Sequence, residues 1–223
     1  MLTLVFDLDG TLIDTAPDLI DTLNLILAQE RLPAMPFEAA RKLIGGGARG
    51  MIEKALIIEG RDCSKVEIDR MFGAFIAHYA EHIADRSRPF PHLEATLEDL
   101  AAQGHRLAVC TNKLEWLSRR LLTTLQLDKY FATICGQDTF AVMKPNPEIL
   151  RQTIMRAGGA AAQAIMVGDS GTDIRTARAA SVPVIAVDFG YTEVPIASLS
   201  PDRIISSFNE LAEAIGEVST RRT

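Results

Sequence analysis

Residues 2–11 read Leu-Thr-Leu-Val-Phe-Asp-Leu-Asp-Gly-Thr, an apolar run that ends in two acids, a glycine and a threonine. Short apolar runs that contain β-branched residues are typical of buried strands, so this stretch predicts a strand over residues 2–6. Asp7, Asp9 and Thr11 follow that strand directly. In sheets of parallel strands, ligands bind outside the carboxyl ends, and these three side chains are therefore candidates for a site.

The alternation of short apolar runs with helical segments continues through the second half of the chain. Strands are predicted over residues 106–110, 132–135, 164–167, 182–187 and 203–205. Helices are predicted over residues 93–103, 115–125, 148–157, 173–180 and 209–217. Strands that alternate with helices are typical of βαβ units, in which the strands lie parallel. The fold class is therefore α/β, with a Rossmann-like doubly wound parallel sheet as its core.

Residues 15–84 interrupt this alternation. They contain only helical patterns, separated by turn signals such as Leu32-Pro33 and Gly45-Gly46-Gly47. An all-helical stretch of this length after the first strand predicts a small cap domain inserted into the core. The expected domains are an α/β core of residues 1–14 and 85–223 and a helical cap of residues 15–84.

Two other predicted strands also end in polar residues. Thr111 and Asn112 follow the strand over residues 106–110, and Asp169 and Asp173 follow the strand over residues 164–167. The carboxyl ends of parallel strands share one edge of a sheet. Four carboxylates, counting the two acids that follow the first strand, are therefore expected in one crevice.

Lys144 adds a cation to this set. It precedes a predicted helix, in a loop whose backbone is stiffened by the prolines at positions 145 and 147. Carboxylates gathered in one crevice repel one another, and Mg²⁺ relieves this because it prefers a few carboxylate oxygens together with water and phosphate. Phosphoryl transfer needs a nucleophilic carboxylate, a hydroxyl donor, a lysine and a metal.

In this order, the motifs resemble those of the haloacid dehalogenase-like (HAD) hydrolase superfamily. The resemblance covers nearly the whole chain, and the family's helical cap is inserted after the first motif, as residues 15–84 are here. It implies a Mg²⁺-dependent phosphatase that forms an aspartyl phosphate. Dehalogenases of the superfamily lack an acid at the position of Asp9, so a phosphatase is favoured over a dehalogenase.

The resemblance also implies a role for each motif residue. Asp7 would attack phosphorus, and Asp9 would protonate the leaving group and then activate water. The implied metal-site residues are Asp7, Asp9 through its main-chain carbonyl, Asp169 and, in support, Asp173. The residues implied to bind the phosphoryl group are Thr111, Asn112 and Lys144.

Several segments resemble the phosphoglycolate phosphatase branch of the superfamily, among them residues 44–49, Tyr79 with His82, and residues 111–113. This branch implies 2-phosphoglycolate as the substrate and Gly46 and Arg49 as specificity residues of the cap. An arginine can bind a carboxylate through two parallel hydrogen bonds. Small pyrophosphatases, nucleotidases and sugar-phosphate phosphatases on the same core are the alternatives.

A phosphoacceptor signalling module or a non-hydrolytic binding protein is the alternative of a different class. Receiver domains also combine acids, a threonine and a lysine on a parallel sheet, but they are about half as long and have no helical insertion of this size. Loss of catalysis on this scaffold would be expected to show as loss of Asp7 or Asp9, and both are present.

Composition excludes several partners. The chain of 223 residues has 23 Lys and Arg against 29 Asp and Glu, which gives a formal net charge of −6. It therefore has no excess of positive charge with which to bind the phosphate backbone of a nucleic acid.

The cysteines and the apolar runs exclude further classes. Cys63, Cys110 and Cys135 are an odd, scattered set that does not suggest a disulfide framework. No apolar run approaches the ~20 residues that span a bilayer. We expect a cytoplasmic monomer or homodimer that binds a small phosphorylated metabolite, and neither nucleic acid nor membrane.

Overall fold

The computed structural model of the protein describes residues 1–192 and 194–220. The chain forms two compact units. The α/β unit consists of Met1–Asp14 together with the described residues from Arg88 onward, and the helical unit is Thr15–Ser87. Within the described residues, no helix has the length and apolar character needed to cross a membrane.

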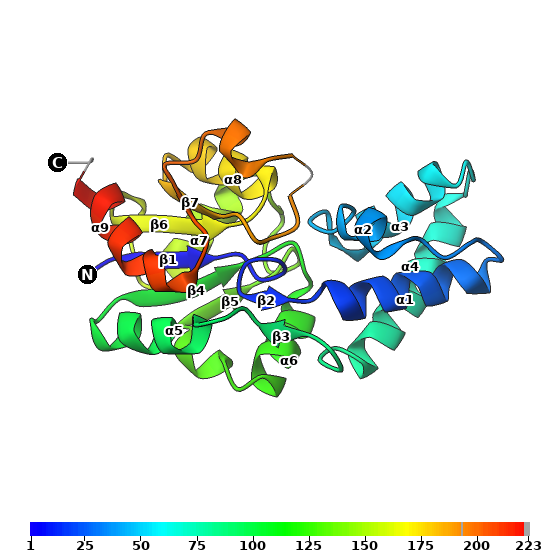
Figure 1. Ribbon diagram of the computed structural model, residues 1–223, viewed down its shortest axis with the longest axis horizontal. Coiled ribbons are helices and arrows are strands. Elements are labelled where there is room, and N and C mark those ends of the chain that lie inside the picture. The colour runs from blue at the N-terminus through cyan, green and yellow to red at the C-terminus, as the bar shows by residue number, and fades with distance from the viewer. Residues whose placement is uncertain (193, 221–223) are drawn as a thin grey trace. The chain divides into compact units, whose positions relative to one another are not determined.

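A six-stranded parallel sheet forms the centre of the α/β unit (Figure 1). The strands lie in the order β5-β4-β1-β6-β7-β8. Their bounds are β1 (Thr3–Phe6), β4 (Arg106–Cys110), β5 (Thr133–Cys135), β6 (Ala164–Gly168), β7 (Val184–Val187) and β8 (Arg203–Ile205). The order reverses at β1, which lies between β4 and β6, and such a reversal opens a crevice for ligands at the carboxyl edge. The predicted α/β class with a Rossmann-like parallel sheet is confirmed.

Helices cover both faces of this sheet. On one face, Val5, Ala108 and Met166 pack in a single buried cluster with α7 (Pro147–Arg156) and α8 (Gly171–Ala180). The neighbouring strand residues, such as Leu4 and Leu107, are equally buried and point to the opposite face, because successive side chains of a strand alternate. The remaining helices of the unit are α5 (Leu93–Ala102), α6 (Glu115–Thr124) and α9 (Leu211–Thr220).

The helical unit, Thr15–Ser87, is built from helices joined by short connections (Figure 1). They are α1 (Ala16–Gln29), α2 (Phe37–Arg41), α3 (Gly47–Ile58) and α4 (Lys65–Glu81). α4 contacts both α1 and α3, and buried Leu23, Ile52 and Phe75 belong to the apolar interior of these helices. α4 begins with a capping box, in which the Ser64 hydroxyl accepts from the Glu67 N–H and the Glu67 carboxylate accepts from the Ser64 N–H.

The boundary of the helical unit lies three residues later than the expected boundary at residue 85. The reason is the buried Asp18 carboxylate near the start of α1, which accepts hydrogen bonds from the N–H of Arg86 and from both the N–H and the hydroxyl of Ser87. These bonds attach residues 86 and 87 to the helices. Immediately outside them, β2 (Ile13–Asp14) pairs antiparallel with β3 (Arg88–Pro89).

Candidate active site

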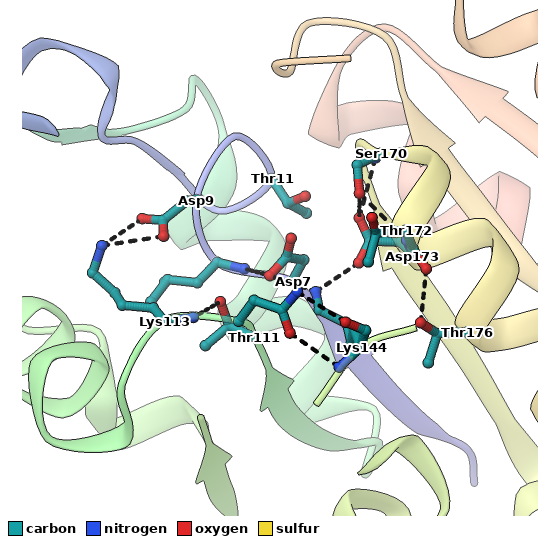
Figure 2. Close-up of polar contacts among 12 residues, drawn as sticks. Asp7, Asp9, Thr11, Thr111, Lys113, Lys144, Ser170, Thr172, Asp173 and Thr176 are labelled. Atoms are coloured by element: carbon teal, nitrogen blue, oxygen red, sulfur yellow. Dashed lines mark hydrogen bonds and ion pairs between the residues drawn. The ribbon is translucent and has the colours of Figure 1, made fainter. Parts of the chain in front are cut away.

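Asp7 directly follows the last residue of β1, at the carboxyl edge of the sheet (Figure 2). Its Oδ1 accepts a hydrogen bond from the Leu8 N–H at 2.7 Å and pairs with Lys144 Nζ at 2.9 Å. The side chain is only 11% exposed. Two donors therefore hold one carboxylate oxygen of a buried acid at the position that the sequence predicts.

Lys144 joins Asp7 to a second acid. Its Nζ lies 2.6 Å from Asp173 Oδ1, and its side chain is 2% exposed. The backbone of Lys144 is held in turn by Asn112, whose Nδ2 donates to the Lys144 carbonyl at 3.1 Å and whose Oδ1 accepts from the Lys144 N–H at 3.0 Å. Both polar atoms of the Asn112 side chain thus position Lys144, and the predicted contact of Asn112 with the phosphoryl group stays a prediction.

Asp173 is held by the first turn of α8. The Ser170 hydroxyl caps this helix by accepting from the Asp173 N–H, and Asp173 Oδ2 accepts from the N–H and hydroxyl of Ser170. Since Oδ1 pairs with Lys144, both oxygens of Asp173 have partners inside the protein. This arrangement suits a supporting residue rather than a freely available metal ligand.

Asp169 follows β6 and is held from two directions. Thr11 donates to its Oδ1 at 3.0 Å, and the Tyr191 N–H donates to its Oδ2 at 2.7 Å. Gly10 has a positive φ of 79°, and a Cβ at this residue would lie 2.5 Å from Asp169 Oδ2. A glycine is required here because the first motif loop passes directly against the acid.

The three buried acids form one cluster, in which ligand oxygens of Asp7, Asp169 and Asp173 lie within 4.8 Å of one another. Burial, together with the charges of Asp173 and Asp7, raises the pKa of Asp169 to about 8. Burial likewise raises the pKa of Asp7 to about 6, against the opposing effect of the Lys144 ammonium. For Lys144 itself, burial lowers the pKa, but the charges of Asp173 and Asp7 outweigh burial and raise it.

This cluster fits a hard divalent cation. It places three carboxylates against one ammonium in a buried site, and burial raises the pKa of two of them, Asp7 and Asp169. A cation held by Asp7 and Asp169 would supply the missing positive charge, and oxygen donors of this type are those that Mg²⁺ prefers.

Thr111 lies just beyond β4 and is 2% exposed. Its N–H donates to the Cys135 carbonyl at 3.0 Å, and its hydroxyl oxygen accepts from the Lys113 N–H at 3.2 Å. The hydroxyl hydrogen of Thr111 is thus left to donate to a ligand in the site.

Asp9 is paired with a residue to which the sequence assigned no role of its own. Lys113 Nζ donates to Asp9 Oδ1 at 2.9 Å and to Asp9 Oδ2 at 3.1 Å (Figure 2). Lys113 lies in the turn between β4 and α6, outside any periodic pattern. A signal was nevertheless present, because it directly follows Thr111 and Asn112 at the same strand end.

The two predicted specificity residues lie in the helical unit. Gly46 is the N-cap of α3. Arg49, in the first turn of α3, pairs with Asp69 Oδ1 at 2.6 Å, and its guanidinium lies 4.9 Å from the centre of the Phe72 ring. These contacts connect α3 to α4. That Arg49 binds the carboxylate of the substrate stays a prediction.

Comparison with known proteins decides the family. A model of the haloacid dehalogenase-like hydrolases matches residues 4–187. Curated proteins named phosphoglycolate phosphatase from Mesorhizobium japonicum and Agrobacterium fabrum are 47% and 45% identical to this chain; each alignment covers 96% of the chain and, respectively, 94% and 91% of the relative. The chain belongs to the haloacid dehalogenase-like hydrolase family.

A solved structure also resembles this hydrolase. The crystal structure of a predicted phosphoglycolate phosphatase from Haemophilus somnus 129pt matches it with a TM-score of 0.89 at 30% identity, covering 96% of this chain and 97% of that one. The family predicted from the four motifs is therefore confirmed. This hydrolase also contains two contacts that sequence reasoning missed, the Lys113–Asp9 pair and the bond from the Tyr191 N–H to Asp169.

Proposed function

We propose that this hydrolase is a Mg²⁺-dependent phosphatase that cleaves 2-phosphoglycolate through a phosphoaspartate on Asp7. The observation that carries the proposal is the placement of the Asp7 carboxylate at the sheet edge, beside Lys144 and within the cluster that includes Asp169. The choice of substrate is supported by the names of relatives that are 47% and 45% identical.

In the first step, an oxygen of Asp7 forms a bond to phosphorus while the bond from phosphorus to the glycolate oxygen breaks. The electron pair of that bond stays on the glycolate oxygen, which takes a proton from the Asp9 carboxyl group. Lys144 and the Thr111 hydroxyl are placed to donate to the phosphoryl oxygens. When bound, Mg²⁺ supplies positive charge to the same oxygens.

In the second step, Asp9 acts as a base. Its carboxylate takes a proton from a water molecule whose oxygen bonds to phosphorus, and the bond between phosphorus and Asp7 breaks. Inorganic phosphate leaves, and the Asp7 carboxylate is regenerated. Asp9 ends the cycle protonated, as it began.

A panel of phosphomonoesters tests the substrate. We expect kcat/KM to rank 2-phosphoglycolate above pyrophosphate, nucleoside monophosphates and hexose phosphates when Mg²⁺ is present. Asp7→Asn serves as the control, because phosphate release that persists in this variant comes from a contaminating enzyme. A higher kcat/KM for any other member of the panel would overturn the substrate assignment and leave the phosphatase assignment standing.

A further inference from the structure

The ion pair between Lys113 and Asp9 is nearly closed off from water. The Lys113 side chain is 5% exposed and the Asp9 side chain 16%. The turn that carries Lys113 is fixed, because the Lys113 N–H donates to Thr111 and its carbonyl accepts from the Gln137 N–H. A Cβ on Gly136 would lie 2.5 Å from the Lys113 carbonyl oxygen, so only glycine allows this close backbone approach. The backbone of Lys113 is therefore held in a fixed position at the edge of the site.

The pair places a buried ammonium beside the group that acts on the leaving oxygen in the proposed reaction. Both oxygens of Asp9 accept hydrogen from Lys113 Nζ, at 2.9 and 3.1 Å. A substrate anion that reaches Asp9 therefore also comes within reach of the Lys113 ammonium, to which it can form a charge-assisted hydrogen bond.

The substrate of the proposed function carries such an anion. In 2-phosphoglycolate, one methylene separates the carboxylate from the bridging oxygen that Asp9 must protonate at hydrogen-bond distance. The carboxylate consequently arrives beside Asp9, and Lys113 Nζ lies 2.9 Å from Asp9 Oδ1. The ammonium has three donors, enough to keep one Asp9 oxygen and bind the substrate carboxylate with another.

We propose that Lys113 is a specificity residue that binds the carboxylate of the substrate. This inference rests on the proposed function and deepens it. A phosphomonoester without a carboxylate lacks this contact. The preference for an acid next to the phosphate is then built into the α/β unit itself.

Binding of two unreactive analogues tests the inference without turnover. In 3-phosphonopropionate, a methylene replaces the bridging oxygen of 2-phosphoglycolate, and propylphosphonate has the same length without the carboxylate. In the Mg²⁺-loaded wild type, calorimetry should show tighter binding of 3-phosphonopropionate, by roughly tenfold to a hundredfold, as expected for one charge-assisted contact. Lys113→Met should remove most of this ratio. Lys129→Met, which replaces an exposed lysine of the same unit, should keep it.

A double variant addresses the objection that Lys113→Met acts only by changing the position of Asp9. Asp9→Asn alone keeps the cation and should keep the preference for 3-phosphonopropionate, whereas Asp9→Asn combined with Lys113→Met should lose it. If the combined variant keeps the preference, or if Asp9→Asn alone loses it, Lys113 does not bind the carboxylate directly. The melting temperature of each variant shows whether it folds. If Lys113→Met does not fold, Lys113→Gln is used in its place.

Kinetics separate this inference from the proposed function. 2-Phosphoglycolate and 2-hydroxyethyl phosphate both have poor leaving groups, and only the first carries a carboxylate. Lys113→Met should lower kcat/KM more for 2-phosphoglycolate than for 2-hydroxyethyl phosphate, mainly by raising KM. Equal losses would mean that Lys113 only positions Asp9 and would overturn the inference. Failure of the wild type to hydrolyse 2-phosphoglycolate would overturn the proposed function instead, and the analogue binding would still decide whether Lys113 recognises a carboxylate.

Discussion

At the scale of single residues, Asp7 is the group whose replacement separates chemistry from folding. We expect Asp7→Asn to lower kcat/KM for 2-phosphoglycolate by at least about a thousandfold, because a carboxamide does not form the phosphorylated intermediate. The variant should unfold at the same or a higher temperature than the wild type at pH 8, because it removes a charge that burial disfavours, and that Asp173 disfavours as well. Asp62→Asn, at an exposed position, is the matched control. Activity within tenfold of wild type would rule out Asp7 as the nucleophile.

At the scale of elements, the pair between Arg49 and Asp69 connects α3 to α4. Both side chains are more than a third exposed, at 40% and 47%, so either Arg49→Ala or Asp69→Ala should lower the free energy of unfolding by no more than about 1 kcal/mol. Because each substitution breaks the same contact, the combined variant should be less destabilised than the sum of the two. Urea titrations followed by circular dichroism measure these differences.

The same two variants decide between the roles of Arg49. If the pair matters only for the helical unit, both variants should leave the ratio of kcat/KM for 2-phosphoglycolate to that for 2-hydroxyethyl phosphate unchanged. A fall of this ratio in Arg49→Ala alone would instead support the substrate role that the sequence suggests. Asp69→Ala is the appropriate control because it frees the guanidinium without removing it.

At the scale of the whole molecule, the buried acids make stability depend on pH and on metal. The pKa of Asp169 in the folded protein is raised from 3.8 to about 8, so between these values the folded state holds a proton that the unfolded chain has released. The metal-free protein should therefore become less stable as pH rises through this range. Bound Mg²⁺ favours the ionised form, and its stabilising effect should be larger at pH 8 than at pH 6.

Thermal unfolding after treatment with EDTA checks this linkage. We expect the rise in melting temperature caused by Mg²⁺ to be greater at pH 8 than at pH 6, and to be largely absent in Asp169→Asn. Equal rises at both pH values would show that binding does not displace a proton from this cluster. In EDTA, activity should be lost; Mg²⁺ should restore it, and Ca²⁺ should do so poorly because it tolerates looser geometry and more ligands.

Much of this molecule could be predicted from its sequence, for identifiable reasons. The strands β1, β4 and β6 are short, mostly apolar runs that are buried on both faces, and Asp7, Thr111 and Asp169 follow them directly. The antiparallel pair of β2 and β3 could not be predicted, because each strand has only two residues and such a short strand has no periodic pattern of apolar residues. The contact of Tyr191 with Asp169 was missed because it joins residues 22 positions apart through a backbone N–H, which any residue except proline could provide.

Trapping the phosphoryl group on the enzyme shows which residue carries it. Asp9→Asn keeps the nucleophile but removes the base for the second step, and p-nitrophenyl phosphate needs no proton on its leaving group. We predict a burst of p-nitrophenolate approaching one equivalent, and after acid quenching, peptide mass spectrometry should find one phosphate on Asp7. A full burst with no phosphorylated protein, or with the phosphate on another residue, would show that Asp7 is not the nucleophile.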